Sequence, residues 1–375
     1  MHLIKFMKNQ IKEKKINLFK DRTYRITISE FNSFDKDTLH SIKKILIIKW
    51  GGMGDLIQSS AVINDILENF SDIKVDLNTM HQWFALFKFD KRINRVWGFN
   101  SGSRIKKIVS IFKWLRIVKK ENYDLIIDLQ TNDRSRIMLT ILKLTQSKPK
   151  YIVGNHPIYP YAPKPKSFRK INQPFIRLQR TIATIGVQPT GTKPILIFPS
   201  MVPKKITNLL KKNCIVDKKF IIFIAGSSKS NQLKRWGIKN FVSLSNLINN
   251  LSYKVVLIGG KDDIEENNSI LKHNKDVINL CNKIALEDLI YIFKKAKLII
   301  ANDTGPTHLA ACSNTPIIQI TGPTNPYMVK PFGEKIESIQ SDIECKNCYK
   351  KVCSHHSCMS DINPIFVFGL IKKFI

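Results

Sequence analysis

The chain has 375 residues, of which 43% are hydrophobic and 24% charged. This length exceeds one ordinary domain and predicts two domains of roughly 150 residues, each able to bury a core. No apolar stretch approaches the roughly 20 residues that a membrane-spanning helix needs, which argues against a transmembrane protein. The 61 Lys and Arg residues exceed the 29 Asp and Glu residues, and the formal net charge of +32 favours anionic partners such as nucleic acid, acidic lipid or phosphorylated sugar.

The basic residues are spread along the whole chain without a zinc-finger, basic-zipper or RNA-recognition signature, so nucleic acid is not the expected partner. The N-terminal residues lack the pattern of a secretory signal, which indicates a cytoplasmic protein. One predicted helical face carries the apolar residues Leu3, Ile4, Met7, Ile11 and Leu18, with lysines elsewhere. Such a helix lies on an anionic membrane surface or packs on its own protein, and the sequence leaves both open.

Short runs of Ile, Leu, Val and Phe alternate with helical patterns, which is typical of a parallel sheet covered on both faces. The clearest strands are expected at residues 45–48, 125–127, 220–224, 255–258, 298–300 and 317–320. The predicted fold class is therefore α/β. Nine prolines interrupt this rhythm between about 150 and 203, and they predict an interdomain region there.

Two strands are followed by similar small-residue turns. The strand at 45–48 leads into Gly51, Gly52, Met53 and Gly54, and the strand at 220–224 leads into residues 225–228, Ala-Gly-Ser-Ser. The repetition predicts two doubly wound, Rossmann-like domains whose turns face a shared cleft. The expected divisions are a basic extension at 1–43, a first domain at 44–190, a second domain at 191–340 and a Cys-rich segment with a terminal helix at 341–375.

The first candidate site is the turn that contains Gly51, Gly52 and Gly54. Glycines allow a tight turn and close approach of a ligand, but the spacing is neither a Walker A loop nor a dinucleotide fingerprint. Asp55 follows where the turn enters a helix. Its carboxylate either caps that helix or acts as a general base.

The second candidate site follows the strand at 298–300, where Asn302 and Asp303 precede a helix that begins at Thr304–Pro306. A Thr or Asp cap with Pro in the first turn is a helix start whose free N–H groups suit a diphosphate. His308 in the first turn either donates to phosphate or ribose or has a structural role.

The third candidate site is the polar loop 227–236, SSKSNQLKRW, at the carboxyl end of the strand at 220–224. Its hydroxyls and either Lys234 or Arg235 suit phosphate oxygens. A fourth feature is the spacing C-x2-C-x4-C-x4-C of Cys345, Cys348, Cys353 and Cys358. Reduced thiols are the preferred interpretation of these cysteines, and a structural zinc site is the alternative.

The motifs WGGMGDLIQSSAVI, SSKSNQLKRW, VVLIGGKDD, NDTGPTHLAA and ITGPTNP together resemble, in order and spacing, glycosyltransferase family nine, the bacterial heptosyltransferases. The resemblance spans about residues 44–335. It implies the two-domain GT-B architecture and an inverting transferase with no required metal or cofactor. The implied donor is ADP-heptose, and the implied acceptor is a phosphorylated lipopolysaccharide core at the cytoplasmic face of the inner membrane.

The resemblance also implies residue roles. Asp55 matches the proposed base, and Asp303 is expected near the sugar. The donor-site matches are Ser227, Ser228, Lys234, Thr304, Gly305 and His308, with Asp262 and Glu265 as candidates for the adenosine ribose. The acceptor candidates are Asp128, Gln130, Arg134 and Arg136, which otherwise form a polar helix entrance.

Three alternatives stay open: a transferase using another nucleotide sugar, a nucleotide-sugar epimerase of the same architecture, and a non-catalytic protein that binds anionic polymers. The sequence departs from the family in its first forty or so residues, in a longer loop before Lys234 and in the run Trp50-Gly51-Gly52. These departures bear on sugar and acceptor identity more than on reaction type.

Overall fold

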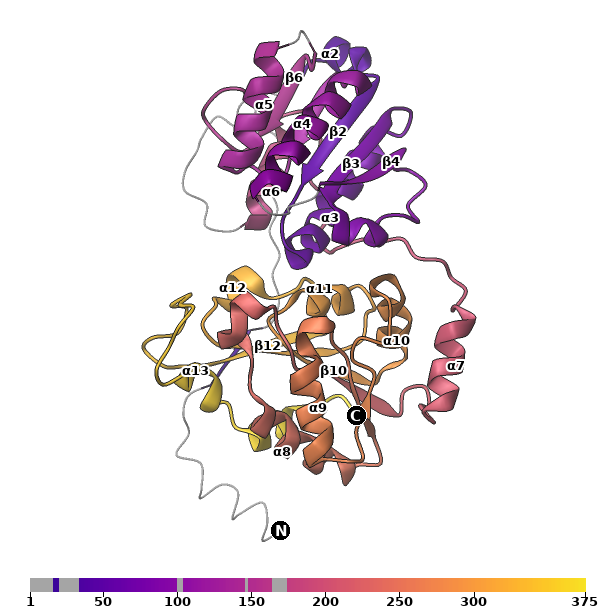
Figure 1. Cartoon of the computed structure of the whole chain (residues 1–375), viewed down its shortest axis with the longest axis vertical. Helices are drawn as coiled ribbons and strands as arrows, with labels where there is room; N and C mark the ends of the chain where they lie inside the picture. Colours follow the sequence, from indigo (N-terminus) through magenta and orange to yellow (C-terminus); the bar gives the residue numbers. More distant parts are fainter. Residues whose placement is uncertain (1–15, 20–33, 100–103, 146–147, 164–173) are drawn as a thin grey trace. The chain divides into compact units, whose positions relative to one another are not determined.

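The computed structural model describes residues 16–19, 34–99, 104–145, 148–163 and 174–375 (Figure 1). The chain divides into two compact units. The N-terminal unit comprises residues 23–200, and the C-terminal unit comprises residues 201–375 together with residues 1–22. The expected amphipathic helix falls mostly outside the described residues, apart from Leu18, which lies in a strand.

The N-terminal unit is built on a five-stranded parallel sheet. Its strands are β2 (Lys44–Lys49), β3 (Lys74–Met80), β4 (Arg95–Phe99), β5 (Leu125–Asp128) and β6 (Tyr151–Gly154). Their spatial order is β4-β3-β2-β5-β6. Numbered along the chain this is 3-2-1-4-5, the order of a doubly wound Rossmann sheet.

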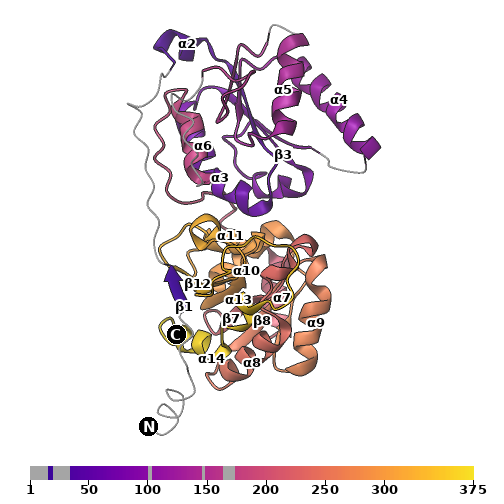
Figure 2. The same ribbon diagram turned by 90° about the vertical axis from the view of Figure 1, so that its left-hand side faces the viewer.

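Helices cover both faces of this sheet, as Figure 2 shows. One face carries α4 (Arg104–Glu121) and α5 (Asp133–Thr145). The other face carries α3 (Met53–Asn69) and α6 (Pro174–Ala183). The short helix α2 (Lys36–Ser41) and the 3-10 helix η2 (His81–Leu86) lie at the periphery. Between the sheet and α4, the indole N–H groups of Trp50 and Trp114 both donate to the Asn78 side-chain oxygen at 2.7 Å. This shared acceptor satisfies two buried donors in an otherwise apolar layer.

The C-terminal unit is built on a seven-stranded sheet. Its strands are β1 (Ile16–Phe19), β7 (Phe220–Ile224), β8 (Lys254–Leu257), β9 (Ile278–Asn279), β10 (Leu298–Asn302), β11 (Ile317–Thr321) and β12 (Ile336–Ser341). The order is β1-β12-β11-β10-β7-β8-β9, and all neighbours are parallel except β1, which pairs antiparallel with β12. Without β1 this is again the Rossmann order, 3-2-1-4-5-6.

The helices of the C-terminal unit also lie on both faces of its sheet. One face packs against α8 (Ile238–Asn249), α9 (Ile264–His273), α13 (Ser357–Ser360) and α14 (Pro364–Ile371). The remaining helices are α7 (Lys204–Lys212), α10 (Leu289–Lys295), α11 (Gly305–Ala311) and α12 (Pro326–Val329), with 3-10 turns η3 (Lys229–Lys234), η4 (Lys261–Asp263) and η5 (Leu286–Asp288). None of the described helices is long and apolar enough to cross a membrane.

All six strands expected from the sequence are present, because each is a β-branched, buried run. The division between the units falls after Ser200, ten residues beyond the expected 190. The reason lies in α3, where Asp65 accepts from the Thr190 hydroxyl at 2.7 Å and Ser60 accepts from the Ile195 N–H at 2.9 Å. These bonds attach the segment after residue 190 to the N-terminal unit.

Candidate active site

Each sheet has one topological switch point, where neighbouring strands send their connections in opposite directions. In the N-terminal unit it lies between β2 and β5, and in the C-terminal unit between β7 and β10. Open α/β sheets bind ligands beyond the carboxyl ends of the strands at such points. The candidate residues of the glycine turn, the loop 227–236 and the segment at Asp303 follow three of these strands, β2, β7 and β10.

The glycine turn positions Asp55 without using it as a cap. Gly52 is the N-cap of α3, no side chain caps this helix, and Asp55 is exposed in the first turn. A Cβ on Gly51 would lie 3.1 Å from a carboxylate oxygen of Asp55, so the absence of a side chain at Gly51 leaves room for that carboxylate. The capping alternative for Asp55 is therefore wrong, and its oxygens are available for chemistry.

Asp55 lines a pocket at this switch point. The pocket residues are Lys49, Asp55, Gln58, Leu129, Gln130, Thr131, Asn155, Pro174, Arg177, Leu178 and Thr181. Lys49 is buried and donates to the Leu129 carbonyl at 3.2 Å. Burial lowers the pKa of the Lys49 ammonium, and the negative charges of Asp55 and Asp128 partly oppose this. The pocket thus combines one exposed carboxylate with cationic side chains, a setting that suits deprotonation of a polar substrate.

The four acceptor candidates are not equivalent. Gln130 lines the pocket, and its side-chain oxygen accepts from the Trp50 N–H at 3.0 Å. Asp128 is fully buried, where burial raises its pKa and the Tyr161 hydroxyl donates to it at 2.7 Å. Arg134 is exposed on α5, and Arg136 pairs with Asp133 at 3.2 Å. Asp128 shapes the loop after β5, and Gln130 is the member of this group beside Asp55.

In the C-terminal unit an ion pair joins the two loops at the switch point. The Lys234 ammonium lies 2.7 Å from Asp303 Oδ2, and the Thr324 hydroxyl donates to the same oxygen at 2.8 Å. Asn302, at the end of β10, strengthens the junction, because its amide donates to the Ala225 carbonyl and its oxygen accepts from the Trp236 N–H at 3.1 Å. The loop after β7 and the loop after β10 are therefore fixed to each other.

The start of α11 completes this group. Thr304 is the N-cap, and its hydroxyl makes no cap bond to the helix. Gly305 is the first helical residue, and His308 is buried within α11. The expected helix start at Thr304–Pro306 is confirmed, with the half-buried Thr304 hydroxyl near the switch point.

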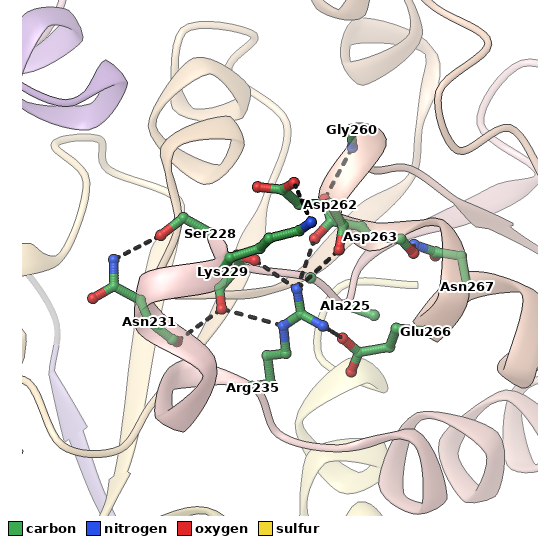
Figure 3. A network of polar contacts seen from close by, with 12 residues as sticks. Ala225, Ser228, Lys229, Asn231, Arg235, Gly260, Asp262, Asp263, Glu266 and Asn267 are labelled. Atoms are coloured by element: carbon green, nitrogen blue, oxygen red, sulfur yellow. Dashed lines mark hydrogen bonds and ion pairs between the residues drawn. The ribbon is translucent and has the colours of Figure 1, made fainter. Parts of the chain in front are cut away.

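Arg235 occupies the centre of a polar network beside this site (Figure 3). Its Nη2 donates to the Ser227 carbonyl at 2.6 Å, and its Nη1 lies 2.8 Å from Glu266 Oε2. It also contacts Asp263 Oδ1 at 3.3 Å. Burial raises the pKa of Glu266 to about 7, while the Arg235 charge opposes that rise. Arg235 therefore holds the loop in place, and Lys234 is the cation of this loop that lines a pocket.

The residues predicted for the adenosine ribose, Asp262 and Glu265, lie next to Asp263 and Glu266 in the chain. Asp262 and Glu265 are exposed, whereas Asp263 and Glu266 carry the carboxylates that face Arg235. Ser227 is buried and its hydroxyl donates to the Asn231 carbonyl at 2.8 Å, while Ser228 is exposed.

The four clustered cysteines are free thiols. Cys358 is buried, and burial, with smaller effects from Cys348, Cys345 and Cys353, raises its pKa to about 11. Within the described residues, no group of three or more His, Cys, Asp or Glu side chains is placed to hold a metal ion. The preference for reduced thiols over a structural zinc site therefore stays a prediction.

We expect single Cys→Ser changes at the two exposed cysteines of this cluster, Cys345 and Cys348, to leave turnover within about twofold of wild type, because exposed thiols make no buried contact that serine would lose. Turnover under reducing conditions, together with metal analysis of chelator-washed protein, checks this. Near-stoichiometric zinc would contradict the preference for reduced thiols, and a folded variant without activity would contradict the noncatalytic assignment.

Two sheets of Rossmann order, each with polar residues at its switch point, define a two-domain α/β protein of the GT-B architecture. Residues 188–359 match the family model described as glycosyltransferase family 9 (heptosyltransferase). The chain is 28% identical over 335 residues to lipooligosaccharide heptosyltransferase 2 of Campylobacter jejuni, covering 86% of this chain and 95% of that protein. It is 25% identical over 345 residues to lipopolysaccharide heptosyltransferase 1 of Campylobacter coli, covering 88% and 98%.

Solved structures show the same fold. A family 9 glycosyltransferase from Veillonella parvula aligns with a TM-score of 0.75 at 17% identity, covering 88% of this chain and 97% of the other. ADP-heptose lipopolysaccharide heptosyltransferase II of Escherichia coli aligns with a TM-score of 0.67 at 18% identity, covering 88% and 98%. The chain is a glycosyltransferase, and the match of residues 188–359 to glycosyltransferase family nine agrees with the family that its ordered motifs predicted.

Proposed function

We propose that this glycosyltransferase transfers a heptose from ADP-heptose to a phosphorylated lipopolysaccharide core sugar, with inversion at the anomeric carbon. The names of the curated relatives support heptosyl transfer to lipopolysaccharide or lipooligosaccharide. An Escherichia coli heptosyltransferase solved with ADP, which shares this fold at a TM-score of 0.63 and 18% identity over 88% of this chain, supports the nucleotide. The high net positive charge suits a phosphorylated acceptor and peripheral association with an anionic membrane surface from the cytoplasm.

The observation that carries the proposal is the contact between Lys234 and Asp303 at the switch point of the C-terminal unit. Departure of a nucleoside diphosphate requires positive charge or hydrogen-bond donors beside the phosphates. Lys234 supplies the positive charge, and the Thr304 hydroxyl, on a separate loop, supplies a donor. We infer that these side chains stabilise the leaving group, which supports a reaction that requires no metal ion.

Asp55 is the proposed general base. Inversion takes place in one displacement, in which the acceptor oxygen forms a bond to the anomeric carbon while the bond to the diphosphate breaks. The proton of the acceptor hydroxyl passes to the Asp55 carboxylate. Exposure of this carboxylate in a pocket, together with its freedom from capping the helix, supports the role.

Incubation of the full chain with ADP-heptose and a heptose-deficient core acceptor tests the proposal. Acceptor-dependent release of ADP, with a mass increase of one heptose on the acceptor, is expected. A new sugar-nucleotide isomer formed without acceptor would instead identify an epimerase. Salt-sensitive binding of an anionic polymer without any sugar-nucleotide binding would favour the binding-protein alternative.

We expect Lys234→Ala to reduce kcat/KM for the donor by about tenfold to a hundredfold, because a charge-assisted hydrogen bond is worth about 1.5–3 kcal/mol. Initial rates at subsaturating donor check this. Lys239→Ala, which removes an exposed lysine of α8, is the matched control and should retain wild-type rates. A folded Lys234→Ala protein with wild-type kcat/KM would move Lys234 out of the donor site.

A further inference from the structure

The pocket beside Lys234 has a second wall that the family motifs do not include. One side is formed by Ser230, Asn231, Leu233 and Lys234 of the loop after β7 and by Pro323, Thr324 and Val329 after β11. The other side is formed by Tyr349, Lys350 and Lys351. These three residues belong to the cysteine-rich segment, residues 345–358, which the proposed reaction does not use.

Direct contacts hold the cysteine-rich segment against both parts of the first wall. The Lys351 ammonium donates to the Asn231 side-chain oxygen, and a ring nitrogen of His356 donates to the Leu233 carbonyl at 2.7 Å. On the other side, the Tyr349 N–H donates to the Pro323 carbonyl at 2.9 Å. The segment is therefore attached to the loop that carries Lys234.

Close packing fixes the far end of the same segment. A Cβ added at Gly322, directly after β11, would lie 2.9 Å from Met359 and 3.1 Å from the Cys358 sulfur. Cys358 and Met359 are both buried in the core of the C-terminal unit. The cysteine-rich segment thus has a buried anchor at its end and a basic stretch at the pocket.

The charges in the pocket indicate that the basic stretch, Lys350 and Lys351, contributes to binding an anion. Lys234 lies 2.7 Å from Asp303, whose negative charge offsets part of the attraction of Lys234 for a diphosphate. Lys350 and Lys351 are exposed, and an ammonium carries three donors, of which Lys351 needs only one to bind Asn231. They add two positive charges to that of Lys234 in this pocket.

We propose that Lys350 and Lys351 bind the diphosphate of the sugar nucleotide, opposite Lys234. Tyr349 positions them, because its hydroxyl accepts from the Asn325 N–H at 3.2 Å while its own N–H is held by Pro323. This inference rests on the proposed function and extends the donor site to the cysteine-rich segment.

Calorimetric titration of the full chain with ADP and with adenosine tests this inference. We expect Lys350→Ala and Lys351→Ala each to weaken ADP binding about fivefold, and the double variant about twentyfold or more, with a smaller dependence of the ADP Kd on salt. Adenosine carries no phosphate, so its affinity should stay at the wild-type value. Lys346→Ala is the matched control, because Lys346 lies in the same segment, pairs with Asp342 and does not line the pocket.

The outcomes separate the two proposals. A double variant that binds ADP with the wild-type Kd overturns the inference and leaves the proposed function standing. An equal loss in Lys346→Ala also overturns it, because general surface charge would then account for the effect. If the wild-type chain binds neither ADP nor ADP-heptose, the proposed function fails together with the inference.

Discussion

Replacing Asp55 with asparagine is expected to lower turnover by about a hundredfold to ten-thousandfold, the usual contribution of a general base. The substitution keeps the size of the side chain and removes its ability to accept a proton. Because Asp55 is exposed and caps nothing, the melting temperature should stay close to the wild-type value. ADP affinity should also persist, since Asp55 and the donor residues lie on different units.

Single-turnover rates at saturating donor and acceptor measure this effect without a contribution from product release. Asp72→Asn is the matched control, because Asp72 is an exposed carboxylate of the same unit that does not line the pocket. An Asp55→Asn protein with a wild-type rate would refute the base assignment. A variant that unfolds at ordinary temperature would show instead that the carboxylate has a structural role.

Removing the guanidinium of Arg235 is expected to have the largest effect on stability. Arg235→Met leaves Glu266, whose side chain is 5% exposed, and the nearby Asp263 without their cationic partner. Breaking a buried ion pair in this way costs about 3–5 kcal/mol of unfolding free energy. Denaturant unfolding at pH 8 measures it, and Lys295→Met, which removes a surface ion pair of the same unit, should cost less than about 1 kcal/mol.

The loss of unfolding free energy caused by Arg235→Met should depend on pH. The pKa of Glu266 is raised from 4.5 to about 7 in the folded chain. A raised carboxyl pKa contributes stability that is fully present below the unfolded value and is lost as the pH rises through the folded value. Removing Arg235 raises the pKa of Glu266 in the folded chain further. The loss of unfolding free energy in the variant, relative to wild type, should therefore be larger at pH 8 than at pH 5. An equal deficit at both pH values would mean that Glu266 does not titrate with folding.

The sequence predicted those parts of the fold that are determined by residues close together in the chain. Runs such as 220–224 and 298–300 are buried and β-branched, and they could only be central strands. The helix start at Thr304 was predictable because the cap and the proline are adjacent in the chain. The strand at 16–19 was missed because its four residues form a strand only by pairing with β12, more than three hundred positions away.

In the candidate site, too, residues whose roles depend on contacts between distant parts of the chain could not be predicted. Lys234, Asp303 and Asp55 could be predicted as candidates because each lies in the segment that follows a strand within an ordered motif. The role of Arg235 was not predictable, since it depends on the direction in which Glu266 faces across a different loop. The burial of Asp128 likewise follows from the Tyr161 hydroxyl contributed after β6, which no spacing near Asp128 indicates.

The pairing of β1 with β12 makes the N-terminal unit an insertion within the C-terminal unit, because the chain passes through the latter's sheet at residues 16–19 and returns to it after Ser200. In a polypeptide that starts at Met201, β12 would become the outermost strand and would present unpaired N–H and C=O groups along one side. Such an edge is a template for pairing between copies. Separating the two halves of the chain at residue 200 would therefore produce a self-associating fragment, whereas joining residues 16–19 to it through a short linker would restore the covered edge.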